Sequence, residues 1–191
     1  MTKEYFSNPS NRSIFVTGEI EEKLAENVIS ALLQLDSQST EPITVYINSK
    51  GGSLPSALAI YDALRTVDSS IITISVGYSG SAALMLLLAG DERLSYENSV
   101  FFYHETVLSK TDIKSPESSE ATAEGYKIFN EKYNGIIKER TSIPMLEWEN
   151  NFKGRTVKFF DSEKALSLGF IHAIVGYALK DNSTLKEDLY G

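Results

Sequence analysis

The sequence contains no cysteine among its 191 residues. This absence excludes disulfide bonds, thiolate metal sites and a cysteine nucleophile, so serine, threonine, lysine and carboxylate side chains are the groups left for covalent catalysis. Histidine is nearly as scarce, because the chain has only 2, His104 and His172. Any imidazole that acts as a base must therefore be one of these two residues.

Long hydrophobic runs and an excess of basic charge are also missing. The longest apolar run, residues 82–89, has 8 residues, whereas a helix that spans a bilayer needs roughly 20. The polar N-terminus lacks the apolar core of a secretory signal. The net charge is −8, although nucleic-acid binding requires clustered Lys and Arg. We therefore expect a soluble, cytoplasmic protein that binds neither membranes nor nucleic acid.

The hydrophobic pattern predicts strands and helices that alternate along the chain. β-Branched and aromatic residues predict strands over 13–16, 43–47, 71–76, 99–103 and 170–175. Apolar side chains at helical spacing predict helices over 19–35, 54–64, 82–89, 119–141, 144–152 and 161–168. This alternation implies a largely parallel sheet in an α/β fold. The length suits a single domain, residues 1–191, with flexible ends over 1–12 and 181–191.

The long helix predicted over 119–141 carries a single apolar stripe. Its members are Tyr126, Phe129, Tyr133, Ile136 and Ile137. We interpret the stripe as a packing surface against this subunit or another one, rather than as a ligand site.

A pair of glycines follows the strand predicted over 43–47, in the segment 48–53, NSKGGS. Glycines let the backbone approach a ligand closely and turn its N–H groups outward, which an oxyanion hole requires. A plain turn is the alternative interpretation. The segment is not a phosphate-binding Walker loop, because Lys50 precedes both glycines.

Two serines lie close together in segment 77–90, GYSGSAALMLLLAG. A serine between a strand and a helix exposes its hydroxyl, and the N–H groups at the start of the helix stabilise negative charge. The hydrolase pattern G-x-S-x-G selects Ser79, but Ser81 replaces its last glycine. Ser79 as a helix cap would put Ser81 in the first turn, so spacing alone leaves the choice open.

The two histidines differ in their surroundings. His104 ends the strand predicted over 99–103 and enters a loop, where catalytic residues often lie. His172 falls within the last predicted strand, and we expect a structural role for it.

These segments resemble the Clp protease proteolytic subunit family, serine peptidases of the crotonase-like fold. The resemblance covers roughly residues 13–176 and is carried by 48–53, 59–62, 77–90, His104 and 163–171. It implies an α/β fold of repeated β-β-α units, here called the ClpP-like fold, with a long protruding helix.

The resemblance also implies a catalytic site. Its nucleophile falls on Ser81, which lies 30 residues after Gly51 as the family pattern expects. The general base falls on His104, and the oxyanion donors fall on the N–H groups of Gly52 and Ala82. Such a site needs no metal or organic cofactor. The implied substrate is an extended or unfolded peptide, and the implied partners are further subunits in two seven-membered rings and an AAA+ unfoldase, the Clp ATPase.

The chain departs from the family pattern around the histidine. Glu105 and Thr106 follow His104 where the family commonly has Gln-Pro, and the triad aspartate aligns with Val157. Valine cannot orient an imidazole, which leaves Thr156 or a backbone carbonyl as a weaker acceptor. One alternative is therefore a catalytically weak or inactive subunit with a structural role in a mixed complex. Another is an acyl-CoA enzyme of the same fold.

Overall fold

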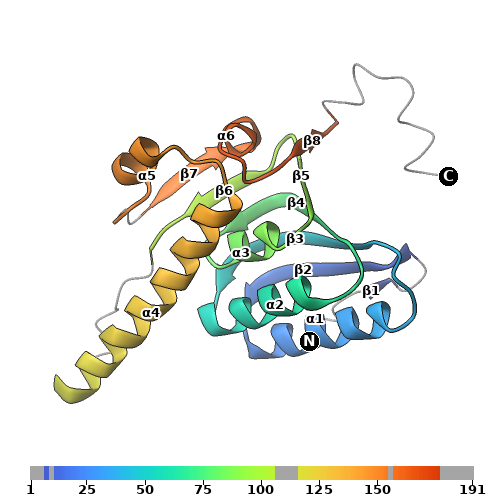
Figure 1. The fold of residues 1–191 in the computed structure, drawn as a ribbon, viewed down its shortest axis with the longest axis horizontal. Helices are drawn as coiled ribbons and strands as arrows, with labels where there is room; N and C mark the ends of the chain where they lie inside the picture. The colour runs from blue at the N-terminus through green and yellow to red at the C-terminus, as the bar shows by residue number, and fades with distance from the viewer. Residues whose placement is uncertain (1–6, 9–10, 106–115, 155–156, 177–191) are drawn as a thin grey trace.

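The structure, a computed structural model, describes residues 7–8, 11–105, 116–154 and 157–176, with side chains from 11–105, 122–154 and 157–176. Most of the loop predicted after His104 and most of the predicted flexible ends therefore lie outside the described residues. Within these ranges the chain forms one sheet flanked by helices (Figure 1).

The sheet has the strand order β1-β2-β3-β4-β5-β8, and β6 pairs with β4 and β7. Its strands are β1 (Ser7–Asn8), β2 (Ser13–Ile20), β3 (Ile43–Gly52), β4 (Ile71–Gly80), β5 (Glu92–Tyr96), β6 (Val100–Tyr103), β7 (Lys158–Asp161) and β8 (Ala173–Val175). Of the pairs, β1·β2 and β6·β7 are antiparallel and the others are parallel. The predicted parallel α/β sheet is confirmed.

The helices are α1 (Glu22–Asp36), α2 (Leu54–Thr66), α3 (Ala83–Leu88), α4 (Pro116–Arg140), α5 (Met145–Asn151) and α6 (Ser162–Ser167). Helices α1 and α2 cover one face of the sheet, and α4 projects from the body of the molecule (Figure 1). Side chains begin two of the helices: Ser53 Oγ accepts the Ser56 N–H, and Asp161 Oδ1 accepts the Lys164 N–H at 2.8 Å. Asp161 is therefore a helix cap, a position that aspartate favours.

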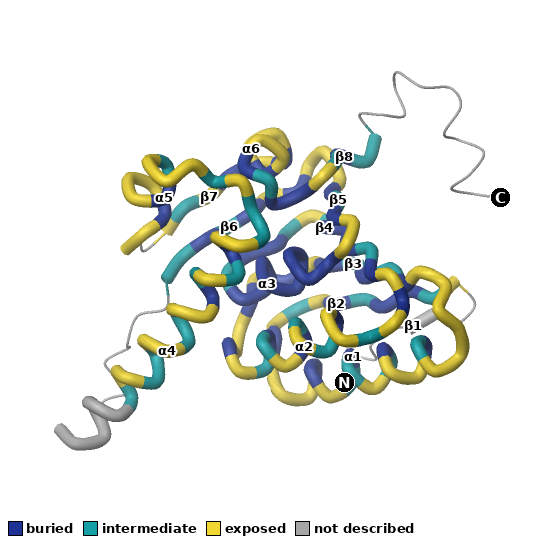
Figure 2. Tube along the Cα trace, viewed as in Figure 1, coloured by how far each residue is buried: buried dark blue, intermediate teal, exposed yellow. Residues whose placement is uncertain are grey.

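Helix α3 lies at the centre of the core. All six of its residues are buried, which the burial colouring in Figure 2 shows as an unbroken dark segment. A short helix that is apolar on every side is stable only when it is surrounded by protein. The residue just before this helix, Ala82, is also fully buried, so the start of α3 is held rigidly against the sheet.

Strands β3 and β4 run further than the sequence predicts. Their predicted ends lie at residues 47 and 76, but pairing continues to Gly52 in β3 and to Gly80 in β4 after a shift in register. Gly51 and Gly52 have φ of 96° and 150°, which glycine adopts at little cost. The plain turn considered for these glycines is therefore wrong.

Three strands and one histidine also differ from the prediction. Strands β1, β5 and β7 were not predicted from the sequence. His172 lies in a bend before β8, not within a strand. Its Nδ1 accepts the Arg93 N–H at 3.3 Å, which supports the structural role expected for this residue.

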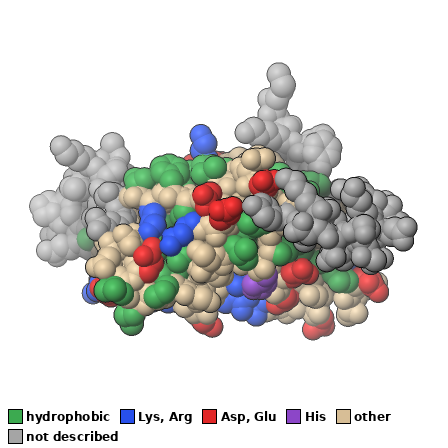
Figure 3. All heavy atoms as spheres, turned by 90° about the horizontal axis from the view of Figure 1, so that it is seen from above, with side chains coloured by type: hydrophobic (Ala, Val, Ile, Leu, Met, Phe, Trp, Pro, Cys, Tyr) green, Lys and Arg blue, Asp and Glu red, His purple; other side chains and the backbone are tan. Residues whose placement is uncertain are grey.

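None of the described helices combines the length and the apolar character that crossing a bilayer requires. On the face drawn in Figure 3, lysine and arginine side chains lie among acidic ones and do not form a continuous basic surface.

Candidate active site

Ser81 occupies the turn between β4 and α3 with φ of 51°, in the left-handed region. The cost of such a conformation for a residue other than glycine is about 1–3 kcal/mol, and such residues cluster at active sites. Two contacts hold it there: its N–H donates to the Phe102 carbonyl at 2.7 Å, and its carbonyl accepts the Tyr133 hydroxyl at 3.2 Å. Sequence patterns did not predict this backbone conformation.

His104 follows the last residue of β6 and lies beside Ser81. Strands β4 and β6 run parallel with Gly80 opposite Phe102, so the residues after these positions meet at the same edge of the sheet. The distance between Ser81 Oγ and His104 Nε2 is 2.6 Å, a short hydrogen bond. Burial lowers the pKa of His104, which favours the neutral imidazole that a base requires.

Ser79 is buried inside β4. Its Oγ lies 2.7 Å from Ser75 Oγ, so its hydroxyl is not available to a substrate. The helix-cap alternative for Ser79 is wrong, because the residue belongs to a strand. Of the two neighbouring serines, only Ser81 contacts a histidine.

The glycine pair passes directly against the nucleophile turn. A Cβ atom on Gly51 would lie 2.7 Å from the Gly80 oxygen and 2.8 Å from Ser81 Cβ. The buried Ser49 hydroxyl accepts the Gly51 N–H at 3.1 Å and fixes this part of β3. The site thus brings β3 against the start of α3. Oxyanion binding by the N–H groups of Gly52 and Ala82 remains a prediction.

A cleft of about 750 Å³ opens in front of the serine and the histidine. It is lined by Gly18, Glu19, Asn48, Lys50, Gly51, Gly52, Tyr78, Ser81 and His104. Sequence reasoning did not select Glu19, Asn48, Lys50 or Tyr78 as site residues. Asn48 and Lys50 lie within segment 48–53, whose glycine pair was the only sequence pattern that indicated a site near these two residues.

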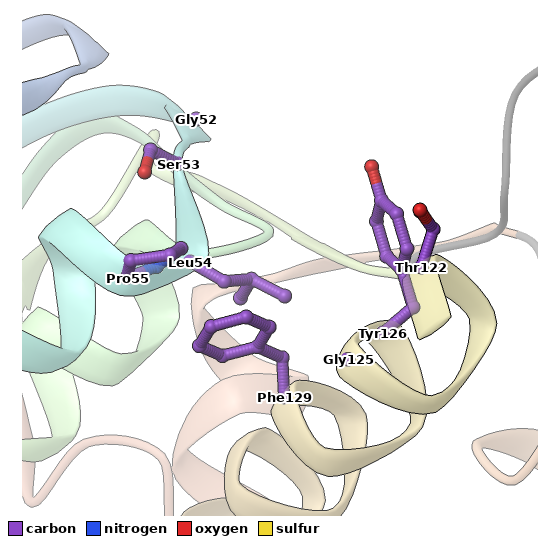
Figure 4. A pocket seen from close by; sticks show the side chains of 8 residues that line it. All are labelled: Gly52, Ser53, Leu54, Pro55, Thr122, Gly125, Tyr126 and Phe129. Carbon is purple, nitrogen blue, oxygen red and sulfur yellow. The ribbon is translucent and has the colours of Figure 1, made fainter. Parts of the chain in front are cut away.

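A second cavity, of about 460 Å³, adjoins the site at Gly52 (Figure 4). Leu54 from α2 and Phe129 from α4 face each other across it, and Tyr126 closes it from α4. Within the apolar stripe of α4, Tyr133 and Ile137 are buried in the core and Phe129 and Ile136 pack against it, which agrees with the interpretation of the stripe as a packing surface. Tyr126 and Phe129 also line the cavity.

Val157 and His104 each lie one residue beyond the last pair of the antiparallel β6·β7 register, in which Tyr103 is opposite Lys158. A continuation of this register by one residue would place Val157 opposite His104. The side chain of Val157 is 55% exposed. Among the described residues, no carboxylate accepts a hydrogen bond from His104, and the Glu105 carboxylate instead accepts from Asn134 on α4 at 2.8 Å.

The other candidate acceptor, Thr156, lies outside the described residues. In the part of the chain with described side chains, no group of three or more His, Asp or Glu residues is arranged to hold a metal ion.

Comparison with known proteins identifies the family. The sequence model of the Clp protease family matches residues 4–178, and the chain therefore belongs to this family. A solved structure of a ClpP1 point mutant from Listeria monocytogenes superposes with a TM-score of 0.78 over 87% of this chain and 92% of the other, at 25% identity. The predicted ClpP-like α/β fold is confirmed.

Two curated relatives match over shorter stretches. The ATP-dependent Clp protease proteolytic subunit of Carsonella ruddii (strain PV) is 38% identical over 96 residues, which is 49% of this chain and 50% of the relative. The ATP-dependent Clp protease proteolytic subunit 2 of Prochlorococcus marinus (strain MIT 9313) is 40% identical over 97 residues, 49% of this chain and 48% of the relative. The chain spans about half the length of the curated relatives it matches.

Proposed function

We propose that this chain is a serine endopeptidase subunit that hydrolyses extended or unfolded peptides, with Ser81 as nucleophile and His104 as general base. The observation that carries the proposal is the 2.6 Å contact between Ser81 Oγ and His104 Nε2, at the edge of an open cleft. Membership of the Clp protease family supports peptide hydrolysis as the reaction.

The mechanism uses only groups of the protein. His104 Nε2 removes the proton from Ser81 Oγ as this oxygen attacks the scissile carbonyl. The N–H groups of Gly52 and Ala82 donate to the oxyanion that forms. The protonated His104 then gives its proton to the leaving amine. Water, deprotonated by the same histidine, releases the acyl group and restores the serine.

The cavity beside Gly52 favours substrates that carry an apolar side chain next to the scissile bond. Its walls include Leu54, Pro55 and Phe129, and it opens beside the proposed oxyanion site. Burial of an apolar substrate side chain there would hold an extended peptide in register with Ser81, since binding away from the reacting bond positions the carbonyl.

Labelling with a fluorophosphonate tests the nucleophile directly. We expect the wild type to be modified at Ser81, as identified by mass spectrometry, and Ser81→Ala to remain unmodified, because the reagent needs an activated serine. The matched control is Ser79→Ala, which removes a buried hydroxyl two residues away and is expected to keep labelling at Ser81. Modification of a different serine would contradict the assignment.

The exposed Val157, one residue beyond the β6·β7 register, favours a second candidate function, a subunit with weak or no activity that acts structurally in a mixed complex. An inactive subunit would not react with the fluorophosphonate, although the chain folds and assembles, and a weakly active one would react slowly at Ser81. The presence and the rate of labelling therefore separate the two functions.

The low pKa of His104 predicts a pH profile. Only the neutral imidazole acts as a base, and burial holds its pKa below the usual histidine value of about 6.5. The pH at which the rate of Ser81 labelling falls to half of its plateau is therefore expected to lie below about 6.5. Measured rates that already halve above pH 7 would contradict this assignment of the base.

We further propose that the chain assembles into two stacked rings of seven subunits that receive unfolded chains from a Clp ATPase. The names of the relatives, which are proteolytic subunits of ATP-dependent proteases, support this proposal. The projecting helix α4 offers a surface for contact between rings.

A further inference from the structure

We propose that the Phe102 side chain positions the imidazole of His104 for Ser81, the part that a carboxylate plays in a serine–histidine–aspartate triad. This inference rests on the proposed function, and it concerns a residue of β6 two positions before the histidine, which follows the last residue of that strand. The rings of Phe102 and His104 are in contact. Phe159, which is paired with Phe102 in the β6·β7 register, lies two residues after the exposed Val157.

The first observation is that Phe102 contacts two other aromatic rings. The ring centroids of Phe102 and His104 lie 4.9 Å apart with an interplanar angle of 24°, a stacked arrangement. The rings of Phe102 and Phe159 are tilted by 32° with centroids 4.8 Å apart, and these two residues are paired in the β6·β7 register. The imidazole thus rests on an aromatic ring that is itself supported from the neighbouring strand.

The second observation is that Gly80 makes room for this ring. Gly80 pairs with Phe102 across β4 and β6. A Cβ atom on Gly80 would lie 2.6 Å from Cε1 of Tyr78 and 3.1 Å from both Cβ and Cδ1 of Phe102, all of them closer than ordinary contact. The absence of a side chain at Gly80 therefore lets Phe102 pack down onto β4, and two strands together determine where its ring lies.

The third observation concerns the backbone of the same residue. The Phe102 carbonyl accepts the Ser81 N–H at 2.7 Å, while its ring stacks on His104. Phe102 thus touches both partners of the Ser81–His104 hydrogen bond. Any displacement of Phe102 therefore changes the distance between them.

Stacking and a carboxylate orient an imidazole in different ways. A flat ring restricts the rotation of the imidazole about its side-chain bonds and excludes water from one of its faces, in keeping with the lowered pKa of His104. It neither fixes the tautomer nor stabilises the imidazolium through charge, as a carboxylate does. Phe102 therefore supports a slower reaction than a complete triad would give.

The test compares Phe102→Leu in two backgrounds. In the wild type we expect the fluorophosphonate labelling rate of Ser81 to fall roughly 10-fold or more, since a small misplacement of a catalytic group costs this much. In a Val157→Asp background a carboxylate orients His104 instead, and the same substitution is expected to cost less than about 3-fold. Phe102→Tyr keeps the ring and is expected to restore most of the wild-type rate.

The matched control is Phe101→Leu. Phe101 is the neighbouring residue on β6, but it points into the core and stacks on Phe160 at 5.4 Å. This variant is expected to lower the melting temperature and to change the labelling rate by the same factor in both backgrounds. If Phe102→Leu also slows labelling by one factor in both backgrounds, or leaves the rate unchanged, Phe102 does not position His104.

A structural readout keeps the inference separate from the proposed function. Absence of labelling in both the wild type and Val157→Asp would overturn the proposed function. Crystal structures of the wild type and Phe102→Leu, or Phe102→Met if the first variant fails to fold, then decide the inference. Loss of the contact between Ser81 Oγ and His104 Nε2 in the variant supports it, and retention of that contact with the imidazole unmoved overturns it.

Discussion

Replacement of Val157 by aspartate is expected to raise the fluorophosphonate labelling rate of Ser81, and kcat/KM for a peptide substrate, by about 10²- to 10⁴-fold. Residues opposite each other on antiparallel strands have Cβ atoms about 4.5–5.5 Å apart. Continuation of the β6·β7 register by one residue beyond the pair of Tyr103 and Lys158 would bring residue 157 to that position relative to His104. A carboxylate there can accept the Nδ1–H of the imidazole, and the 55% exposure of Val157 leaves space for it.

The charge of the new carboxylate provides a second readout. A negative group beside the imidazole stabilises its protonated form, so the pKa of His104 is expected to rise in Val157→Asp. The acid limb of the pH profile then moves to higher pH as the rate at neutral pH increases. Val157→Asn is the control, because asparagine has nearly the same shape as aspartate but carries no charge. An equal gain from asparagine would contradict the electrostatic explanation, and no gain from either would favour the structural subunit.

Gly51→Ala is expected to abolish labelling at Ser81 and to destabilise the fold by about 2–4 kcal/mol. The new Cβ would lie 2.7 Å from the Gly80 oxygen and 2.9 Å from the Ala82 nitrogen. Both atoms belong to the backbone of the nucleophile turn, so relief of the clash must move Ser81 or the proposed oxyanion donor. Thermal unfolding and labelling of the same preparation measure both effects.

Gly176→Ala is the matched control for this substitution. Gly176 has φ of 102°, close to the 96° of Gly51, and nothing lies within 4 Å of a Cβ built there. It therefore carries the left-handed strain without the clash, and we expect a loss of stability of about 1 kcal/mol with normal labelling. An equal loss in the free energy of unfolding for the two variants would show that Gly51→Ala acts through backbone strain, and not through a clash with the turn that contains Ser81.

The sequence predicted the elements whose side chains follow a regular period. Helices α1, α2 and α4 have apolar residues at helical spacing. Strands β5 and β7 were missed for a physical reason. Strand β5 has 5 residues and β7 has 4. Both contain charged side chains, and Arg93 of β5 is buried, so neither strand shows a regular alternation of apolar and polar residues.

The choice between the two serines depended on where β4 ends. Its regular apolar pattern stops near Val76, yet pairing with β3 and β6 carries the strand through Ser79 to Gly80. Local propensity cannot reveal this extension, because it depends on partners far away in the sequence. The same holds for the contact between Phe102 and Phe159, which exists only through the β6·β7 register. The Ser81–His104 pair was predicted through the family resemblance. The extension of β4 and the aromatic contacts beside His104 were not predicted.

At Ser81 the residue that catalysis requires is not the residue that would make the fold most stable. Glycine would adopt φ of 51° without steric cost, so folding alone would favour glycine there, and the hydroxyl would be lost. The Phe102 carbonyl accepts the N–H of Ser81, and the Tyr133 hydroxyl donates to the carbonyl of Ser81, so both polar groups of the serine backbone are held in place. The nucleophile is thus arranged before any substrate arrives, and the free energy for this arrangement comes from the folded chain, not from substrate binding.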